Sequence, residues 1–194
     1  MSAPLAAPEA LALLESSGAI LSGHFRLSSG AHSDRYIQCA RALEHPARSE
    51  PLGAGIAALA RSIAIDAVAA PALGGLIIGH EVARALGVRF IFAEREEKRF
   101  ALRRGFEVAR GERLLLVEDV LTTGGSVSEL REVVEAAGAT AVAVGAIVNR
   151  TDGAFHPGIP VFTLVTLDVP RYSADACPLC ARGVPLVKPG SRPA

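Results

Sequence analysis

The sequence predicts a single α/β domain whose central, mostly parallel sheet is flanked by helices on both faces. Half of the 194 residues are hydrophobic, only 5% are aromatic and none is Trp, which suits a core of aliphatic side chains. Short apolar runs alternate with amphipathic segments through the middle of the chain. Strands that are buried on both faces give such runs, and ligands bind at their carboxyl ends.

The N-terminal part predicts a helix followed by a small hairpin. Residues 8–17 (PEALALLESS) have helical apolar spacing, and Gly18 is placed to end that helix. In residues 24–40 (HFRLSSGAHSDRYIQCA), Ser-Ser-Gly separates two candidate strands outside the main sheet. We expect about residues 1–45, with a C-terminal segment of about 168–190, to form a hood over the substrate.

Helices and strands alternate through the rest of the chain. The predicted elements are a helix near 48–64, a strand and glycine turn at 66–75, a helix at 75–87, strands at 88–94 and 113–119, a helix at 126–138, and strands at 140–150 and 160–167. The Pro- and Gly-rich tail after Cys177 predicts an irregular surface segment. Because no internal repeat or linker is found, we expect one domain over residues 1–194.

Charge and hydropathy exclude several classes of protein. Acidic and basic residues balance at 20 each, so neither nucleic acid nor an anionic membrane is expected as the main partner. No stretch approaches the roughly 20 apolar residues of a membrane span, and the N-terminus does not resemble a secretory signal. These features predict a cytoplasmic protein with reduced thiols.

The cysteines and histidines show no metal-binding spacing in the sequence. Cys177 and Cys180 form a single C-x-x-C with no second pair or His near them, and Cys39 stands alone. We therefore expect free thiols in a helix, and no four-ligand zinc site unless another subunit contributes. His32, His80 and His156 are assigned no role.

The segment LLLVEDVLTTGGSV, residues 114–127, carries the clearest chemistry. Gly124 and Gly125 allow a tight turn with bare N–H groups at a helix N-terminus, which together make a phosphate cradle. Glu118 and Asp119, at the carboxyl end of the strand, suit the hydroxyl groups of a ribose and could approach Mg²⁺ through water. The segment therefore predicts a site for a phosphorylated sugar.

The glycine-rich segments also admit other interpretations. A glycine turn after a buried strand is ordinary in α/β folds, and paired acids there can simply cap a helix. No G-x-x-x-x-G-K-[ST] loop is present, and GAGIAA at residues 53–58 does not follow a strand as a dinucleotide site requires. PALGG at residues 71–75 is equally compatible with a plain strand-to-helix turn.

The segment VEDVLTTGGS resembles the signature of the type I phosphoribosyltransferases. FRLSSGAHSDRYIQ, IFAEREEKRFALRRGF and AIVNR are similar to the orotate phosphoribosyltransferases, in order and at compatible spacing, over roughly residues 10–190. This resemblance implies the type I fold with an N-terminal hood, and phosphoribosyl diphosphate (PRPP) and orotate as substrates. It also implies Mg²⁺ carried by PRPP without a direct protein ligand, and a homodimer that makes orotidine 5'-monophosphate in pyrimidine synthesis.

The resemblance also implies roles for individual residues. Glu118 and Asp119 would bind the ribose of PRPP, and its 5-phosphate would be bound along the loop of Val120, Leu121, Thr122, Thr123, Gly124, Gly125 and Ser126. A basic loop with Arg95, Lys98 and Arg99 would reach the neighbouring site. Lys98, Arg95 and Asp119 would be catalytic, with Lys98 stabilising the departing pyrophosphate, and Arg150, Thr122 and Tyr36 would bind orotate.

The chain departs from the orotate pattern at three places. Ser28 stands where the hood usually has Lys, Ile37 follows Tyr36 where an aromatic pair is usual, and Phe100 stands near the loop position of a usual His. The alternatives left open are a purine phosphoribosyltransferase and a PRPP-sensing regulator on the same fold. Residues 94–106 could also form a solvated charged hairpin, in which Arg103 and Arg104 are surface or dimer contacts.

Overall fold

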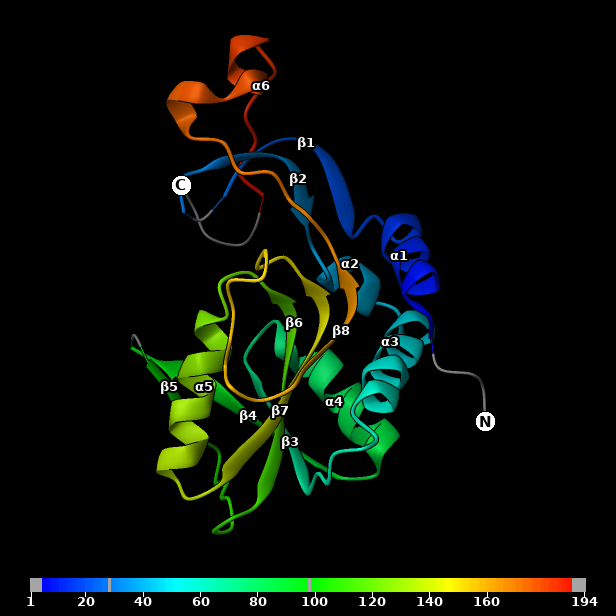
Figure 1. The fold of residues 1–194 in the computed structure, drawn as a ribbon, viewed down its shortest axis with the longest axis vertical. Helices are drawn as coiled ribbons and strands as arrows, with labels where there is room; N and C mark the ends of the chain where they lie inside the picture. Colours follow the sequence, from blue (N-terminus) through cyan, green and yellow to red (C-terminus); the bar gives the residue numbers. More distant parts are fainter. Residues whose placement is uncertain (1–4, 28, 98, 190–194) are drawn as a thin grey trace.

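The computed structural model describes residues 5–27, 29–97 and 99–189, and a six-stranded sheet forms its centre (Figure 1). The strand order is β5, β4, β3, β6, β7, β8, and all neighbours are parallel except β5, which pairs antiparallel with β4. Their bounds are β3 Ala67–Pro71, β4 Arg89–Glu96, β5 Arg99–Leu102, β6 Arg113–Leu121, β7 Thr140–Asn149 and β8 Val161–Thr166. The chain runs outward from β3 to β4 and returns to β6 on the other side of β3, so the switch point of the sheet lies between the ends of β3 and β6.

Helices cover both faces of this sheet. Their bounds are α1 Ala7–Ser16, α2 Ala40–Leu43, α3 Pro46–Leu59, α4 Gly75–Leu86 and α5 Gly125–Ala136. Leu115 and Leu116 of β6 are both fully buried, but Leu115 packs with side chains of α3 and α4, whereas Leu116 packs with those of α5. The continuous apolar run of β6 thus fills two hydrophobic cores, one on each face.

A second, two-stranded sheet lies above the carboxyl ends of the main strands (Figure 1). It consists of β1 (Ile20–Arg26) and β2 (His32–Ile37), and the chain beyond β8 returns to it with a 3-10 turn, η1 (Ala174–Ala176), and the short helix α6 (Pro178–Ala181). Val187 pairs with Phe25, and Tyr172 pairs with His32. We call the β1–β2 hairpin together with residues 168–189 the hood.

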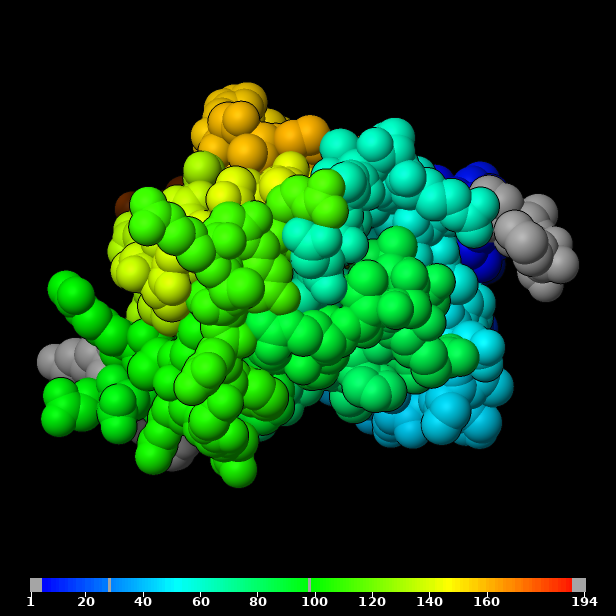
Figure 2. Space-filling view, turned by 90° about the horizontal axis from the view of Figure 1, so that it is seen from below, coloured from blue at the N-terminus to red at the C-terminus, as the bar shows by residue number. Residues whose placement is uncertain are grey.

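The opposite end of the molecule is viewed from below in Figure 2. The cyan and green middle part of the chain forms most of this face. In Figure 1, the carboxyl ends of the strands face the hood, and their amino ends face the opposite end of the molecule. Within the described residues, no helix has the length and apolar character needed to span a membrane.

Most of the predicted elements are confirmed, with shifts of a few residues at their ends. The helix expected near 48–64 is wrong at its far end, because α3 stops at Leu59 and Ile63 packs against the core from a turn. The strand expected at 88–94 continues to Glu96, and β5, which only the charged-hairpin alternative anticipated, folds back along it. Charged residues dominate that hairpin, so its sequence lacks the apolar run that identifies the other strands.

The burial of β6 on both faces gives a stability prediction. Leu115→Ala and Leu116→Ala should each lower the free energy of unfolding by about 2–5 kcal/mol, because each leaves a cavity in a different core. Leu59→Ala, at a side chain that is 45% exposed, is the control and should cost less than about 1 kcal/mol. Urea denaturation measures all three, and a large loss in only one of the two β6 variants would contradict a sheet covered on both faces.

Candidate active site

Two adjacent carboxylates lie at the end of β6, beside the switch point of the sheet. Glu118 is buried and Asp119 is half-buried. The Asp119 N–H donates to Glu118 Oε1 at 3.1 Å, and the Val120 N–H donates to Asp119 Oδ1 at 2.8 Å. Backbone donors from the strand end therefore fix both side chains in place.

Burial has a strong effect on the titration of this acid pair. It raises the pKa of Glu118 well above its usual range, and the neighbouring charge of Asp119 raises it further. Cys39, whose thiol lies 4.0 Å from the Asp119 carbonyl oxygen, also has a raised pKa because it is buried and faces the two acids. Glu118 thus holds its proton more tightly than an exposed carboxyl group would.

The loop after β3 passes directly beside the acids. A Cβ added to Gly74 would lie 2.9 Å from Asp119 Oδ1 and 3.3 Å from Glu118 Oε1, so only glycine fits without moving a carboxylate. The peptide bond between Ala72 and Leu73 in this loop is cis, and the Leu73 side chain is exposed. PALGG therefore brings bare backbone to the acid pair, as a close approach to a ligand requires.

The loop between β6 and α5 forms a small hollow next to Glu118. Its volume is about 50 Å³, and it is lined by Glu118 and Val120 to Val127. Gly124 has φ +78°, and a Cβ there would overlap the ring of Phe155. The N-cap residue of α5, Gly124, has no side chain to cap the helix, and the Gly125 N–H makes only a long hydrogen bond, of 3.4 Å, to the Thr123 hydroxyl. The N-terminus of α5 can therefore receive an anion, and Thr122 and Thr123 are exposed beside it.

Arg150 lies at the end of β7, on the same edge of the sheet. Its Nε is buried without a hydrogen-bond partner, and its pKa is lowered by burial and then by the nearby charge of Arg171. Tyr36 of the hood is close enough to influence Arg150 electrostatically, and an Arg171 N–H donates to the Arg150 carbonyl oxygen at 3.2 Å. A half-buried guanidinium with an unsatisfied donor suits a carboxylate ligand.

The predicted basic loop falls where β4 and β5 meet, with Arg95 in β4 and Arg99 at the start of β5. Arg95 forms an ion pair with Glu129 of α5 at 3.1 Å and lies over the ring of Phe100, and Glu129 also accepts the Phe100 N–H at 2.7 Å. Lys98 lies outside the described residues, as does Ser28. Arg104 and Arg103 form ion pairs with Glu94 and Glu96, as the charged-hairpin alternative predicted.

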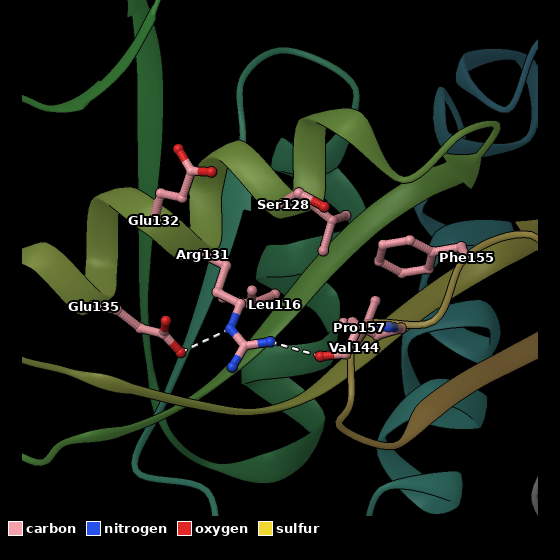
Figure 3. A pocket seen from close by; sticks show the side chains of 9 residues that line it. Leu116, Ser128, Arg131, Glu132, Glu135, Val144, Phe155 and Pro157 are labelled. Atoms are coloured by element: carbon pink, nitrogen blue, oxygen red, sulfur yellow. Dashed lines mark hydrogen bonds and ion pairs between the residues drawn. The ribbon is translucent and has the colours of Figure 1, made fainter.

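A larger cavity, of about 240 Å³, lies between α5 and the loop around Phe155 (Figure 3). Arg131 points into it, but this side chain donates to Glu135 at 2.7 Å and to the Pro157 carbonyl oxygen at 2.6 Å. Leu116 and Val144 line the cavity from the α5 face of the sheet, whereas the acid pair lies at the strand ends. Its size alone does not make it the active site, because the arginine that lines it is already bonded to protein groups.

Comparisons with known proteins agree with this geometry. The phosphoribosyl transferase domain model matches residues 45–174. The orotate phosphoribosyltransferase of Pelotomaculum thermopropionicum is 51% identical over 184 residues, which is 95% of this chain and 97% of that protein. That of Caldanaerobacter subterraneus is 50% identical, over 94% of this chain and 96% of that protein.

The chain belongs to the orotate phosphoribosyltransferase family. A solved structure also supports the fold: the orotate phosphoribosyltransferase of Aeropyrum pernix has a TM-score of 0.67 and 29% identity, over 80% of this chain and 92% of that one. The structural neighbours confirm the predicted type I fold, with a mostly parallel sheet flanked by helices. In this member of the family, Glu118 and the loop from Val120 to Val127 line one hollow, and Tyr36 is close enough to Arg150 to act on its charge.

Sequence reasoning missed two groups near the site. Arg171 contacts Arg150 from the hood, and Asp34 of β2 has a buried Oδ1 without a hydrogen-bond partner. Arg171 lies outside the predicted strands, and Asp34 lies in the segment FRLSSGAHSDRYIQ, which implied a role only for Tyr36, so no local pattern singled out either residue. Arg171 lies beside Arg150 because the fold brings the hood over the strand ends.

The raised pKa of Glu118 gives a pH-dependent stability prediction. The folded protein keeps this proton at pH values where the unfolded chain has released it, so stability is lost as pH rises from the ordinary Glu pKa through the raised one. Glu118→Gln removes that loss and keeps the Oε1 acceptor. The Tm of the ligand-free variant should therefore exceed that of the wild type by a few degrees at about pH 8, and by less at about pH 5.

Thermal unfolding at a series of pH values measures the difference. Glu132→Gln, at an exposed residue of α5, is the matched control and should follow the wild-type curve. If Glu118→Gln is less stable than the wild type at about pH 8, the claim that burial leaves the Glu118 carboxylate uncompensated is wrong.

Proposed function

We propose that this chain transfers ribose 5-phosphate from PRPP to orotate, giving orotidine 5'-monophosphate and pyrophosphate in pyrimidine synthesis. The observation that carries the proposal is the position of an acid pair, a bare backbone loop and an uncapped helix N-terminus at one switch point of the sheet. Family membership and the names of relatives at about 50% identity support the choice of orotate.

Each part of the site fits one part of PRPP. Glu118 and Asp119 accept hydrogen bonds from the ribose hydroxyls. The loop that begins with Val120 and Leu121 binds the 5-phosphate through the N–H groups and hydroxyls of Thr122 to Ser126. The loop around Gly74 approaches the acids closely enough to place its backbone against the pyrophosphate. Ribose, phosphate and leaving group are thus held in fixed relative positions.

The base pocket lies between the hood and the end of β7. The unsatisfied Arg150 side chain neutralises the carboxylate of orotate, while Tyr36 and Thr122 position the ring. A purine has no carboxylate to compensate the buried guanidinium, so Arg150 disfavours purines. A hood over the strand ends would also exclude water during transfer.

The reaction is a displacement at the anomeric carbon. A ring nitrogen of orotate forms the new bond to this carbon while the bond to the pyrophosphate oxygen breaks, through a transition state with oxocarbenium character. Mg²⁺ bound with PRPP would neutralise charge on the pyrophosphate, with Glu118 and Asp119 as oxygen groups that can contact it through water. Lys98, supplied by the neighbouring subunit of a homodimer, stabilises the departing pyrophosphate together with Arg95.

An absorbance assay of orotate consumption with PRPP tests the function and the role of Arg150 together. The wild type should consume orotate, and adenine or hypoxanthine should not replace it. Arg150→Ala should raise KM for orotate about 10- to 100-fold, because it removes a charge-assisted contact, with little change in PRPP affinity. Arg61→Ala, an exposed arginine after α3, is the control; a purine-specific wild type would overturn the orotate assignment and leave the transferase class intact.

Substitutions in the loop and the acid pair should separate catalysis from binding. Lys98→Ala should lower kcat about 100-fold or more with PRPP affinity nearly unchanged, whereas Asp119→Asn should weaken PRPP binding about 10-fold or more. Steady-state kinetics and calorimetric titration with PRPP measure the two effects. Turnover close to wild type in Lys98→Ala would refute the role of Lys98.

A mixing experiment tests the homodimer. If Lys98 serves the partner's site, Lys98→Ala and Asp119→Asn should complement each other at limiting PRPP, where each alone has low turnover. An equal mixture should reach about a quarter of wild-type turnover, because half of the dimers then contain one intact site. No recovery in a mixture that is shown to exchange subunits would place Lys98 in the site of its own chain.

A further inference from the structure

The hood brings together two histidines and two cysteines that are far apart in the sequence. His24 Nε2 lies 3.0 Å from His32 Nδ1, 3.5 Å from Cys177 Sγ and 3.7 Å from Cys180 Sγ, and Cys180 Sγ lies 3.3 Å from His32 Nδ1. The four atoms all lie within 4.8 Å of one another. The expectation that no histidine lies near Cys177 and Cys180 is therefore wrong, because β1 and β2 each place a histidine beside them.

These distances fit a tetrahedral metal site. Around a zinc ion at about 2.3 Å from sulfur and about 2.0–2.1 Å from nitrogen, neighbouring ligand atoms lie about 3.3–3.8 Å apart. The four separations given above lie within about 0.3 Å of this range, and the other two do not exceed 4.8 Å. Cys177 and Cys180 are free thiols, so both sulfurs are available as ligands.

The tautomer of His24 is already the one that a metal needs. Its Nδ1 lies 2.7 Å from the Val184 carbonyl oxygen, and a carbonyl can only accept a hydrogen bond, so Nδ1 carries the proton. In the neutral ring the lone pair is then on Nε2, the atom that faces both sulfurs. Metal-bound histidines are oriented in this way by a second hydrogen bond.

Burial also favours a metal over a loose set of polar groups. His24, His32 and Cys177 are 2%, 5% and 3% exposed, and only Cys180 reaches the surface. Two thiolates and two imidazoles select Zn²⁺ over Mg²⁺ or Ca²⁺, which prefer oxygen ligands. With all four positions taken by protein, no place is left for a reacting water, so the site is structural.

We propose that His24, His32, Cys177 and Cys180 bind one Zn²⁺ ion, which fastens the C-terminal segment to the β1–β2 hairpin. The backbone already joins the same parts, because Val187 pairs with Phe25 and Tyr172 pairs with His32. The ion would close the hood, whose elements β1, β2 and α6 lie near the top of Figure 1. The hood carries Tyr36 and Arg171, so the ion also stabilises the part of the chain that lies over Arg150.

The metal content of untagged protein tests the proposal without any substrate. The protein is incubated with ZnSO₄, and unbound zinc is removed by gel filtration. Elemental mass spectrometry should then find about one zinc ion per chain. Cys177→Ser, Cys180→Ser and His24→Ala should each lose most of it. Cys39→Ser and His156→Ala, which change a cysteine and a histidine outside the cluster, should retain it.

A second measurement does not depend on the folding of the variants. Replacing zinc by Co²⁺ in the wild-type chain should give strong thiolate-to-cobalt charge-transfer absorption and the intense visible bands of a tetrahedral site. A chelator that removes the metal should lower the Tm of the wild type and leave that of folded Cys180→Ser unchanged. Folded wild-type protein without bound metal, a Cys177–Cys180 disulfide, or full zinc in the ligand variants would overturn the proposal.

Discussion

The burial of two adjacent carboxylates at the end of β6 is the constraint around which the site is built. Burial disfavours the charged form of Glu118, and the neighbouring Asp119 adds repulsion. The acids remain fixed because Asp119 N–H and Val120 N–H donate to them. A ligand that donates hydroxyl groups and brings a cation would offset both the burial of Glu118 and its repulsion from Asp119. The ligand-free site thus lowers the stability of the fold, a cost that binding sites commonly carry.

The neighbouring elements follow from this arrangement. Gly74 leaves no Cβ beside the acids, and Gly124 takes a positive φ where any side chain would strike Phe155. Across the same edge of the sheet, Arg150 keeps a buried Nε without a partner. Acceptors, bare N–H groups and one unsatisfied cation are thus set at three strand ends, and together they complement a sugar phosphate and an anionic base.

Local patterns were sufficient for the sheet and for the position of the loop after β6, which we propose to bind phosphate. An apolar strand, two acids and a Thr/Gly/Ser turn lie within residues 114–127, so the physical reasons for the site are visible in one segment. The search for apolar runs did not identify β5, because its pairing with β4 depends on charged residues. The histidine and cysteine cluster escaped for a different reason: His24 and Cys177 are 153 residues apart, and spacing in the sequence cannot show which side chains the hood brings together.

The most direct test is a crystal structure of the chain with PRPP and Mg²⁺. The predicted result is that the carboxylates of Glu118 and Asp119 lie within about 3.2 Å of the ribose hydroxyls, with the 5-phosphate on the N–H groups that begin α5. A PRPP molecule whose phosphate lies beside Arg131 in the larger cavity, with the acid pair making no contact to ribose, would contradict the account.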